Sequence, residues 1–260
     1  MGHQIRKKIK NINNMKNKFK YHNVEWDGKK VDRMWNYFTK VQKNQSKWFS
    51  ELMSSGIINY SNKVLKPNKN VKILDYGAGK GFLIDHLIAK KFSNSDVGEF
   101  SKEGLNALNT KFNNSSVKCF DLSETPSGIV DESYDLVFLI EVVEHLDDHY
   151  LNKTVEECYR ILKPGGSIIV TTPFNEDLEA NNVCCPDCGA IFHRVQHVRS
   201  WTFKSIAKEM KPFKPTHIHN TNFFIYKSDL SIKRKISNLI KRFFFYKWVK
   251  RPHLIYIGKK

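Results

Sequence analysis

The segment that most constrains the fold is an apolar run that ends in three glycines at alternate positions. Val71–Tyr76 predicts a strand, and Gly77, Gly79 and Gly81 follow it directly. Glycine lets the backbone turn sharply and approach a ligand closely. A dinucleotide-binding turn has the spacing G-x-G-x-x-G, whereas this segment has G-x-G-x-G. The spacing therefore indicates a ligand-binding turn between a strand and a helix, but not a pyrophosphate cradle.

Strands and helices are expected to alternate after this turn. Short apolar runs predict the strands, and apolar residues three or four positions apart predict the helices between them. Such alternation is typical of a parallel sheet covered on both faces, so we expect an α/β, doubly wound, Rossmann-like fold. The further predicted strands are Asp96–Phe100, Val117–Phe120, Tyr134–Ile140, Ser167–Thr172, Thr216–Tyr226 and His253–Gly258, with a turn at residues 164–166.

The pattern also divides the chain into regions. Residues 31–59 carry apolar side chains at helical spacing, and a linker with a proline turn signal follows at residues 66–70. We therefore expect an N-terminal helical cap at residues 1–70 and a main domain at residues 71–260. Residues 174–200 interrupt the alternation and hold three of the five cysteines, so we expect an insertion there.

Composition bears on partners and location. Lys and Arg number 43 against 26 Asp and Glu, a formal net charge of +17. This excess favours anionic partners, although Lys is abundant throughout the chain and an equally good explanation is a general bias in composition. The sequence has no apolar stretch long enough to span a membrane and no apolar signal segment, so we expect a cytoplasmic protein with reduced cysteines.

Acidic residues follow the glycine turn in a fixed order. Asp75 ends the first strand, Glu99 ends the second, where a carboxylate can accept hydrogen bonds from ribose hydroxyls, and Asp121 follows the third. Two further motifs come before the fifth strand, Tyr134-Asp135-Leu136-Val137 and Leu162-Lys163-Pro164-Gly165-Gly166. Over residues 70–173 the sequence resembles the class I S-adenosylmethionine-dependent methyltransferases.

This resemblance implies a fold, a cofactor and a binding site. The fold is a seven-stranded sheet of order 3-2-1-4-5-7-6 with the last strand antiparallel. The cofactor is S-adenosyl-L-methionine, with Asp121 at the adenine amino group. The residues implied in cofactor binding are Asp75, Gly77, Ala78, Gly79, Glu99, Phe100, Asp121, Leu122 and Glu141.

A second group of polar residues follows the fourth strand. Glu141, Glu144 and His145 have the spacing i, i+3 and i+4, which places them on one face of a helix. Two carboxylates and an imidazole can hold a divalent cation or remove a proton from an acceptor hydroxyl. We predict catalytic roles for Glu144 and His145. The alternative is that Glu141 closes the cofactor site while the other two residues only support the loop.

A later histidine extends this group. With His197 and the Trp201-Thr202 pair that follows it, the E-x-x-E-H segment resembles the small-RNA 3′-terminal 2′-O-methyltransferases. The resemblance implies a divalent metal, Mg, Mn or Zn, held by Glu141, Glu144, His145 and His197. The same E-x-x-E-H form occurs in methyltransferases of small hydroxylated molecules, so it indicates metal-assisted O-methylation more than RNA as substrate.

The insertion offers a competing metal site. Cys185 and Cys188 have C-x2-C spacing, and His193 and His197 follow with H-x3-H spacing. This pattern is typical of a structural zinc knuckle, with Cys184 as an extra ligand. Both sites need His197, so they cannot both be complete. The third possibility is a reduced insertion without metal, whose histidines line the acceptor pocket.

Basic and aromatic residues alternate near the C-terminus. Ser231–Lys250 predicts a helix with an apolar side formed by Ile232, Ile236, Leu239, Ile240, Phe243 and Phe244. Such a helix suits a membrane surface or single-stranded nucleic acid. We favour a simpler arrangement, in which the apolar side packs on the sheet, because a predicted strand follows directly.

Together these features predict methyl transfer to a small polar acceptor. We expect O-methylation of a hydroxylated or anionic small molecule, such as a phosphorylated or sugar-containing metabolite of surface-glycan biosynthesis. The first alternative is a 2′-O-methyltransferase of RNA ribose, for which nucleic acid would be the partner. The second is a non-catalytic S-adenosylmethionine-binding partner subunit.

Overall fold

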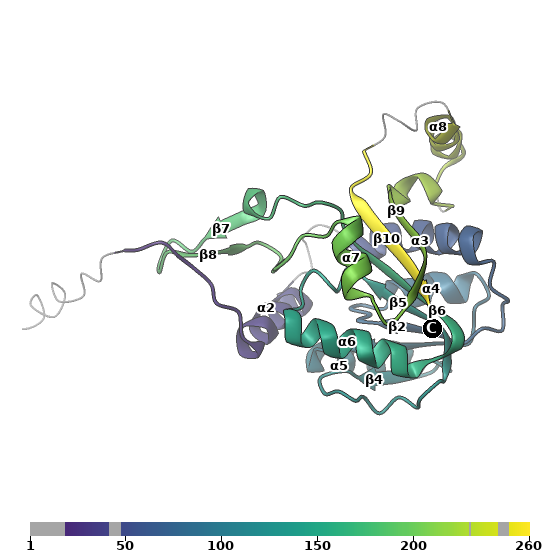
Figure 1. Cartoon of the computed structure of the whole chain (residues 1–260), viewed down its shortest axis with the longest axis horizontal. Coiled ribbons are helices and arrows are strands. Elements are labelled where there is room, and N and C mark those ends of the chain that lie inside the picture. Colours follow the sequence, from purple (N-terminus) through teal and green to yellow (C-terminus); the bar gives the residue numbers. More distant parts are fainter. Residues whose placement is uncertain (1–18, 42–47, 229, 244–249) are drawn as a thin grey trace, which may run out of the picture.

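The main body of the protein is a seven-stranded sheet with helices on both faces (Figure 1). The computed structural model describes residues 19–41, 48–228, 230–243 and 250–260. The strands are β2 (Ile73–Tyr76), β3 (Ser95–Glu99), β4 (Cys119–Asp121), β5 (Tyr134–Ile140), β6 (Leu162–Pro173), β9 (Lys214–Thr221) and β10 (His253–Lys259). Their order is β4-β3-β2-β5-β6-β10-β9, with β10 antiparallel to both neighbours, which confirms the predicted topology.

Alternation of side chains along the central strand explains the two covered faces. In β5, Leu136, Phe138 and Ile140 point into one core, and Val137 and Leu139 point into the other. The first core is completed by α3 (Phe49–Leu65), α4 (Phe82–Ala89) and α5 (Lys102–Phe112). The second is completed by α6 (Asp148–Ile161) and α7 (Phe203–Glu209). The predicted α/β fold class is therefore confirmed.

Two strand boundaries differ from the prediction. The expected turn at residues 164–166 lies inside β6, where the pairing with β5 shifts register between Leu162 and Ser167. The proline and glycines therefore form an outward irregularity in a longer strand. At the other end of the domain, β9 stops at Thr221, and the predicted continuation becomes the 3-10 helix η2 (Phe223–Tyr226).

The N-terminal region and the insertion share a second, smaller sheet. Its strands are β1 (His22–Asn23), β8 (Ala190–His193) and β7 (Asn182–Cys184), in that order, and a 3-10 helix η1 (Glu179–Asn181) precedes β7. The predicted helical region 31–59 comprises α2 (Gly28–Val41) and α3, and residues 42–47 lie outside the described residues. Of the two described helices of this region, α3 packs on the main sheet, which leaves α2 for the predicted cap.

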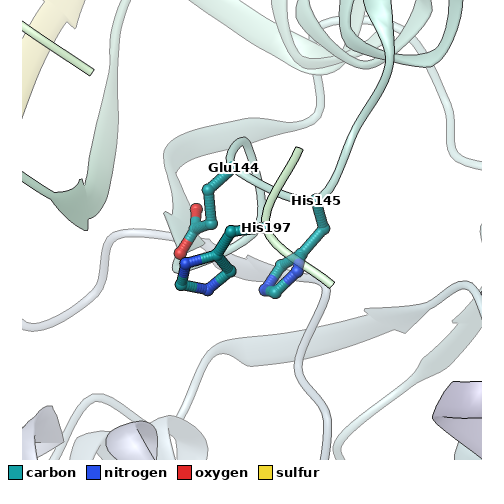
Figure 2. A group of neighbouring side chains, drawn as sticks. All are labelled: Glu144, His145 and His197. Atoms are coloured by element: carbon teal, nitrogen blue, oxygen red, sulfur yellow. The ribbon is translucent and has the colours of Figure 1, made fainter. Parts of the chain in front are cut away.

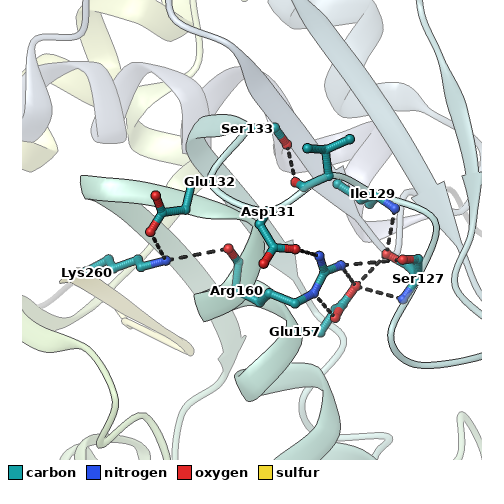
Figure 3. A network of polar contacts seen from close by, with 9 residues as sticks. Ser127, Ile129, Asp131, Glu132, Ser133, Glu157, Arg160 and Lys260 are labelled. Carbon is teal, nitrogen blue, oxygen red and sulfur yellow. Dashed lines mark hydrogen bonds and ion pairs between the residues drawn. The ribbon is translucent and has the colours of Figure 1, made fainter.

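A polar network holds the amino edge of the sheet, opposite the edge where parallel strands usually bind ligands (Figure 3). Arg160, at the end of α6, forms ion pairs with Glu157 and Asp131. Glu157 also accepts a 2.9 Å hydrogen bond from the amide of Ser127. The C-terminal Lys260 reaches Glu132 at 3.3 Å. This network joins the segment before β5, the end of α6 and the end of β10. It lies at the amino edge, so the carboxyl edge of the sheet is left for the site.

The helix α8 (Ile232–Phe243) connects β9 to β10 and stands off the sheet (Figure 1). Our expectation that its apolar side packs on the sheet is wrong, because Ile232, Ile236 and Leu239 are 75%, 54% and 52% exposed. The predicted continuation through residues 244–249 lies outside the described residues. None of the described helices combines the length and apolar character needed to cross a membrane.

Candidate active site

The glycine turn connects β2 to α4 with three left-handed glycines at alternate positions. Gly77, Gly79 and Gly81 have φ angles of 88°, 55° and 71°. A Cβ atom at Gly77 would lie only 2.7 Å from Cγ2 of Val142, and one at Gly81 only 2.9 Å from the ring of Phe112. The first and third glycines are thus needed for packing as well as for conformation. A Cβ at Gly79 would meet only Trp48, at 3.6 Å, so the left-handed backbone alone requires glycine there.

Glu99 braces this turn from the neighbouring strand. Its Oε2 accepts a 2.8 Å hydrogen bond from the amide of Gly79, and its Oε1 accepts bonds from the amides of Phe100 and Ser101 at 2.9 and 3.0 Å. Burial raises the pKa of Glu99, while these amide hydrogen bonds oppose the rise. The carboxylate therefore orders the backbone on which a nucleoside would rest.

The other expected cofactor residues gather around the same turn. Asp75 is buried, and burial together with the charge of Glu99 raises the pKa of Asp75 to about 8. The amide of Ala78 donates to the carbonyl of Gly98, and the ring of Phe100 packs edge-on against Tyr76 at 5.5 Å. These contacts make the floor of the turn rigid.

Asp121 and Leu122 lie at the end of β4. The Oδ1 atom of Asp121 accepts a 2.8 Å hydrogen bond from the amide of Ser123, and its side chain is exposed. Leu122 is buried, and its amide donates to the carbonyl of Glu99. The ends of β2, β3 and β4 therefore bring the predicted cofactor residues to one edge of the sheet.

Glu141 occupies a strained position directly after β5. Its φ of 51° is unusual for a residue with a side chain. Its amide donates to the carbonyl of Thr171, and its Oε1 accepts a 2.9 Å bond from the Thr171 hydroxyl. Burial raises the pKa of Glu141 to about 8. The segment after it is a turn before α6, not the helical turn that the spacing predicted.

Glu144, His145 and His197 form the centre of the site (Figure 2). One possible ligand atom from each lies within 4.8 Å of the others. Glu144 is fully buried; its Oε2 accepts a 3.1 Å bond from the Thr172 hydroxyl, and its Oε1 has no hydrogen-bond partner. Burial and the charge of Glu141 raise the pKa of Glu144. A buried carboxylate oxygen without a partner is costly unless a proton or a cation reaches it.

Hydrogen bonds define how the two histidines present their nitrogens. His145 Nδ1 lies 3.3 Å from the carbonyl of Gln196, and His197 Nδ1 lies 2.5 Å from Oε2 of Glu176. A carbonyl oxygen can only accept, so Nδ1 of His145 carries the hydrogen and Nε2 of the neutral ring keeps a lone pair, while Nδ1 of His197 donates to the carboxylate of Glu176. Burial lowers the pKa of His145 to about 3, so this imidazole is neutral.

Glu176 is the residue that sequence reasoning missed. It belongs to a second candidate cluster with His193 and His197. His193 Nδ1 accepts the amide of His197 at 3.1 Å, so its Nε2 carries the hydrogen, 3.5 Å from Oε1 of Glu176. Burial tends to raise the pKa of Glu176, but the hydrogen bond and charge of His197 outweigh it and lower the pKa. Glu176 therefore holds the ring of His197 through Nδ1, and His193 holds its main-chain amide.

The zinc-knuckle set is not assembled. Cys185 and Cys188 lie in the turn between β7 and β8, where the amide of Gly189 donates to the carbonyl of Cys185 at 2.9 Å. His193 is the last residue of β8, so the length of this strand lies between the turn and His193. Strands rise about 3.3 Å per residue. Among the residues that the structure describes, neither cysteine joins a metal-ligating group. The extra ligand Cys184 is exposed on β7.

Gln196 connects the histidine loop to α2. It is fully buried with a φ of 63°, and its Nε2 donates to the carbonyl of His145 at 2.9 Å. Its Oε1 accepts a 2.9 Å bond from Nε1 of Trp35, whose ring packs edge-on against His145 at 4.9 Å. The helix α2 therefore covers the centre directly.

The central part of the chain is similar in sequence to known methyltransferases. Residues 74–170 match the family described as a methyltransferase domain. A ubiquinone biosynthesis O-methyltransferase of Chelativorans sp. (strain BNC1) is 31% identical over 121 residues, which cover 45% of this chain and 46% of that protein. The chain spans less than half the length of each of several such curated relatives.

Solved structures share the fold over nearly the whole chain. The Burkholderia thailandensis 1,6-didemethyltoxoflavin-N1-methyltransferase, crystallised with S-adenosylhomocysteine, matches with a TM-score of 0.60 and 11% identity over 92% of this chain and 93% of that one. The [4+2]-cyclase SpnF matches with a TM-score of 0.58 and 13% identity over 92% of this chain and 98% of that one. The fold alone therefore does not specify a reaction.

Proposed function

We propose that the chain is a class I S-adenosylmethionine-dependent methyltransferase and that it methylates a hydroxyl of a small polar acceptor with the help of a divalent cation. The observation that carries the proposal is the group of Glu144, His145 and His197 beside the glycine turn. Val142, which packs on Gly77, lies in the same short segment as Glu144 and His145. The proposed acceptor centre therefore begins two residues along the chain from a side chain that packs on the donor turn.

The residues of the glycine turn fit S-adenosylmethionine. The left-handed glycines give a close backbone surface, Glu99 holds that surface in place, and Asp121 is exposed at the adjacent strand end. When bound, the cofactor supplies a methyl group on a sulfonium that is already activated. The protein then has to align an acceptor oxygen and remove one proton.

Glu144, His145 and His197 fit a divalent cation. They offer one buried carboxylate oxygen that has no hydrogen-bond partner among the described residues, and one nitrogen from each of two imidazoles, a 2-His-1-carboxylate set. A bound cation would act as a Lewis acid toward the acceptor hydroxyl. Glu141 lies outside this group because Thr171 holds its carboxyl group, so we assign it a role between the donor and acceptor sites.

The proton of the acceptor needs a base with a suitable pKa. The pKa of His145 is lowered to about 3, which makes His145 a weak base at neutral pH and suits it to a neutral ligand role. The pKa of Glu141 is raised to about 8, close to the value that general acid–base catalysis favours. We therefore assign proton removal to a carboxylate of this loop, Glu141 or Glu144.

The acceptor class is inferred from charge and chemistry. The net charge of +17 favours an anionic acceptor, and the metal set favours a hydroxyl. Phosphorylated or sugar-containing metabolites of surface-glycan biosynthesis combine both properties. The curated relative from Chelativorans is an O-methyltransferase, whereas the Burkholderia neighbour methylates a nitrogen, so hydroxyl specificity rests on the metal set alone.

A release assay for S-adenosylhomocysteine tests the proposal. The purified chain would be screened with sugar nucleotides, phosphorylated metabolites and RNA, each with Mg²⁺, Mn²⁺, Zn²⁺ or a chelator. We expect turnover on a hydroxylated small molecule that a chelator abolishes and a divalent ion restores. Turnover that is indifferent to chelation would overturn the metal assignment while leaving methyl transfer intact.

The same screen distinguishes the two alternatives. RNA ribose methylation is favoured by the E-x-x-E-H segment and the positive charge, and it predicts RNA binding that weakens steeply with salt. A non-catalytic binding subunit predicts S-adenosylhomocysteine binding but no turnover in any arm.

A further inference from the structure

The helix α8 presents its apolar side to solvent. Ile232, Ile236, Leu239 and Ile240 form an apolar ridge, with exposed fractions of 75%, 54%, 52% and 43%. Their spacing of four, three and one residues keeps them within one stripe of the helix surface. Loss of apolar contact with water drives helix packing in most proteins, so a helix with its apolar ridge outward lacks its usual partner.

The protein holds α8 by its polar side instead. Asn238 is the buried residue of the helix, at 5% exposure, and its Nδ2 donates a 3.1 Å hydrogen bond to the carbonyl of Phe224 in η2. In helical projection Asn238 lies roughly 140° from the centre of the apolar ridge. The attachment therefore directs the ridge away from the sheet, in line with the exposure of its side chains. Figure 1 shows that the helix as a whole stands off the sheet.

The charged residues of α8 itself are all basic. Lys233, Arg234 and Lys235 are all exposed, and the sequence contains no acidic residue from Leu230 to the C-terminus. Lys233 and Lys235 flank the two edges of the ridge in projection. An apolar ridge between basic edges is the pattern of helices that lie in the interface of an anionic bilayer.

We propose that α8 docks the protein on an anionic membrane surface, with the apolar ridge inserted at the level of the headgroups and the lysines on phosphate groups. A second copy of the chain suits this face poorly, because two uniformly basic helices would repel each other. Nucleic acid would engage the charges but would leave the ridge in water. Docking of this kind needs no spanning helix.

Vesicle flotation with the full chain tests this inference. The probes are vesicles of phosphatidylcholine alone, and of phosphatidylcholine with about one third phosphatidylglycerol. We expect binding to the second kind, with much less to the first and a decrease in about 0.5 M salt. The double variant I236S/L239S keeps the charge but removes the centre of the ridge, and should bind roughly tenfold or more weakly. The matched control S237A changes an exposed residue off the ridge and should bind like the parent.

Three outcomes would overturn the inference. One is absence of binding to the anionic vesicles. Another is unchanged binding of I236S/L239S, which would reduce the interaction to charge alone. The third is a parent chain that sediments as a dimer and a double variant that sediments as a monomer, which would assign the ridge to a second copy. Circular dichroism of both variants verifies that they fold, and because the substituted side chains are exposed we expect parent-like spectra.

Discussion

Glu176 Oε2 lies 2.5 Å from Nδ1 of His197, the histidine that also belongs to the group with Glu144 and His145. A carboxylate behind a metal-binding histidine selects its tautomer and orients its ring. Glu176 belongs to the segment after β6, and Glu144 belongs to the turn after the neighbouring strand β5. The supporting carboxylate and the supported centre therefore come from adjacent strand ends.

Substituting Glu176 with glutamine should weaken the proposed metal site without affecting the donor site. Loss of such a supporting carboxylate typically reduces metal affinity about 10- to 100-fold. Calorimetric titration with Mn²⁺ would measure this loss, and titration with S-adenosylhomocysteine on the same sample would show whether donor affinity is unchanged. Equal Mn²⁺ affinity in Glu176→Gln and the parent would show that Glu176 does not support a metal ligand.

Replacing His145 with alanine should depress turnover and spare donor binding. We expect a loss of about 10²- to 10⁴-fold in turnover, because an electrostatic anchor of the acceptor is removed. A purely supporting role predicts a different pattern, with a lower free energy of unfolding, weaker donor binding and little specific loss of rate. Near-normal turnover of His145→Ala on the true acceptor would exclude a direct part for this histidine.

The donor site should depend on Gly79 and Glu99. Valine at Gly79 would have to adopt a φ of 55°, which a β-branched residue rarely tolerates, and alanine at Glu99 removes the acceptor of the Gly79 amide. Calorimetry with S-adenosylhomocysteine should show clearly weaker binding for both variants. Gly128→Ala is a suitable control, since a Cβ there meets nothing within 4 Å. Parent-like affinity in both test variants would refute the site assignment.

Asp75 should make the stability of the protein depend on pH. Its pKa rises from 3.8 to about 8 on folding, mainly through burial. The folded protein keeps a proton that the unfolded chain releases, so the free energy of unfolding decreases as pH rises between those two values. Asn at this position has no proton to release. Asp75→Asn should therefore gain stability relative to the parent as the pH rises from 5 to 8, roughly within that window. Urea unfolding of both proteins at the two pH values measures the change. A constant difference would disprove the proton uptake.

The sequence pattern predicts the main sheet well because its rules are local. The left-handed backbone at Gly77, Gly79 and Gly81 favours glycine, and the short apolar run of β5 between turn signals favours a buried strand. Parts that depend on distant contacts escaped prediction. Trp35 and Gln196 meet across 161 positions, and no spacing rule signals that bond. Periodicity likewise identifies the apolar side of α8 but cannot tell what that side faces. Glu176 could have been found, because it follows the strand beside β5.

Gln196 gives the site one further property. The buried side-chain amide of Gln196 accepts a hydrogen bond from Trp35 on α2 and donates one to the main chain of His145. The main-chain carbonyl of Gln196 fixes the tautomer of that histidine. Withdrawal of α2 to admit an acceptor would remove the roof and loosen the imidazole in the same motion. The cover over the centre and the position of its imidazole are thus tied to one side chain, so a displacement of either would be transmitted to the other.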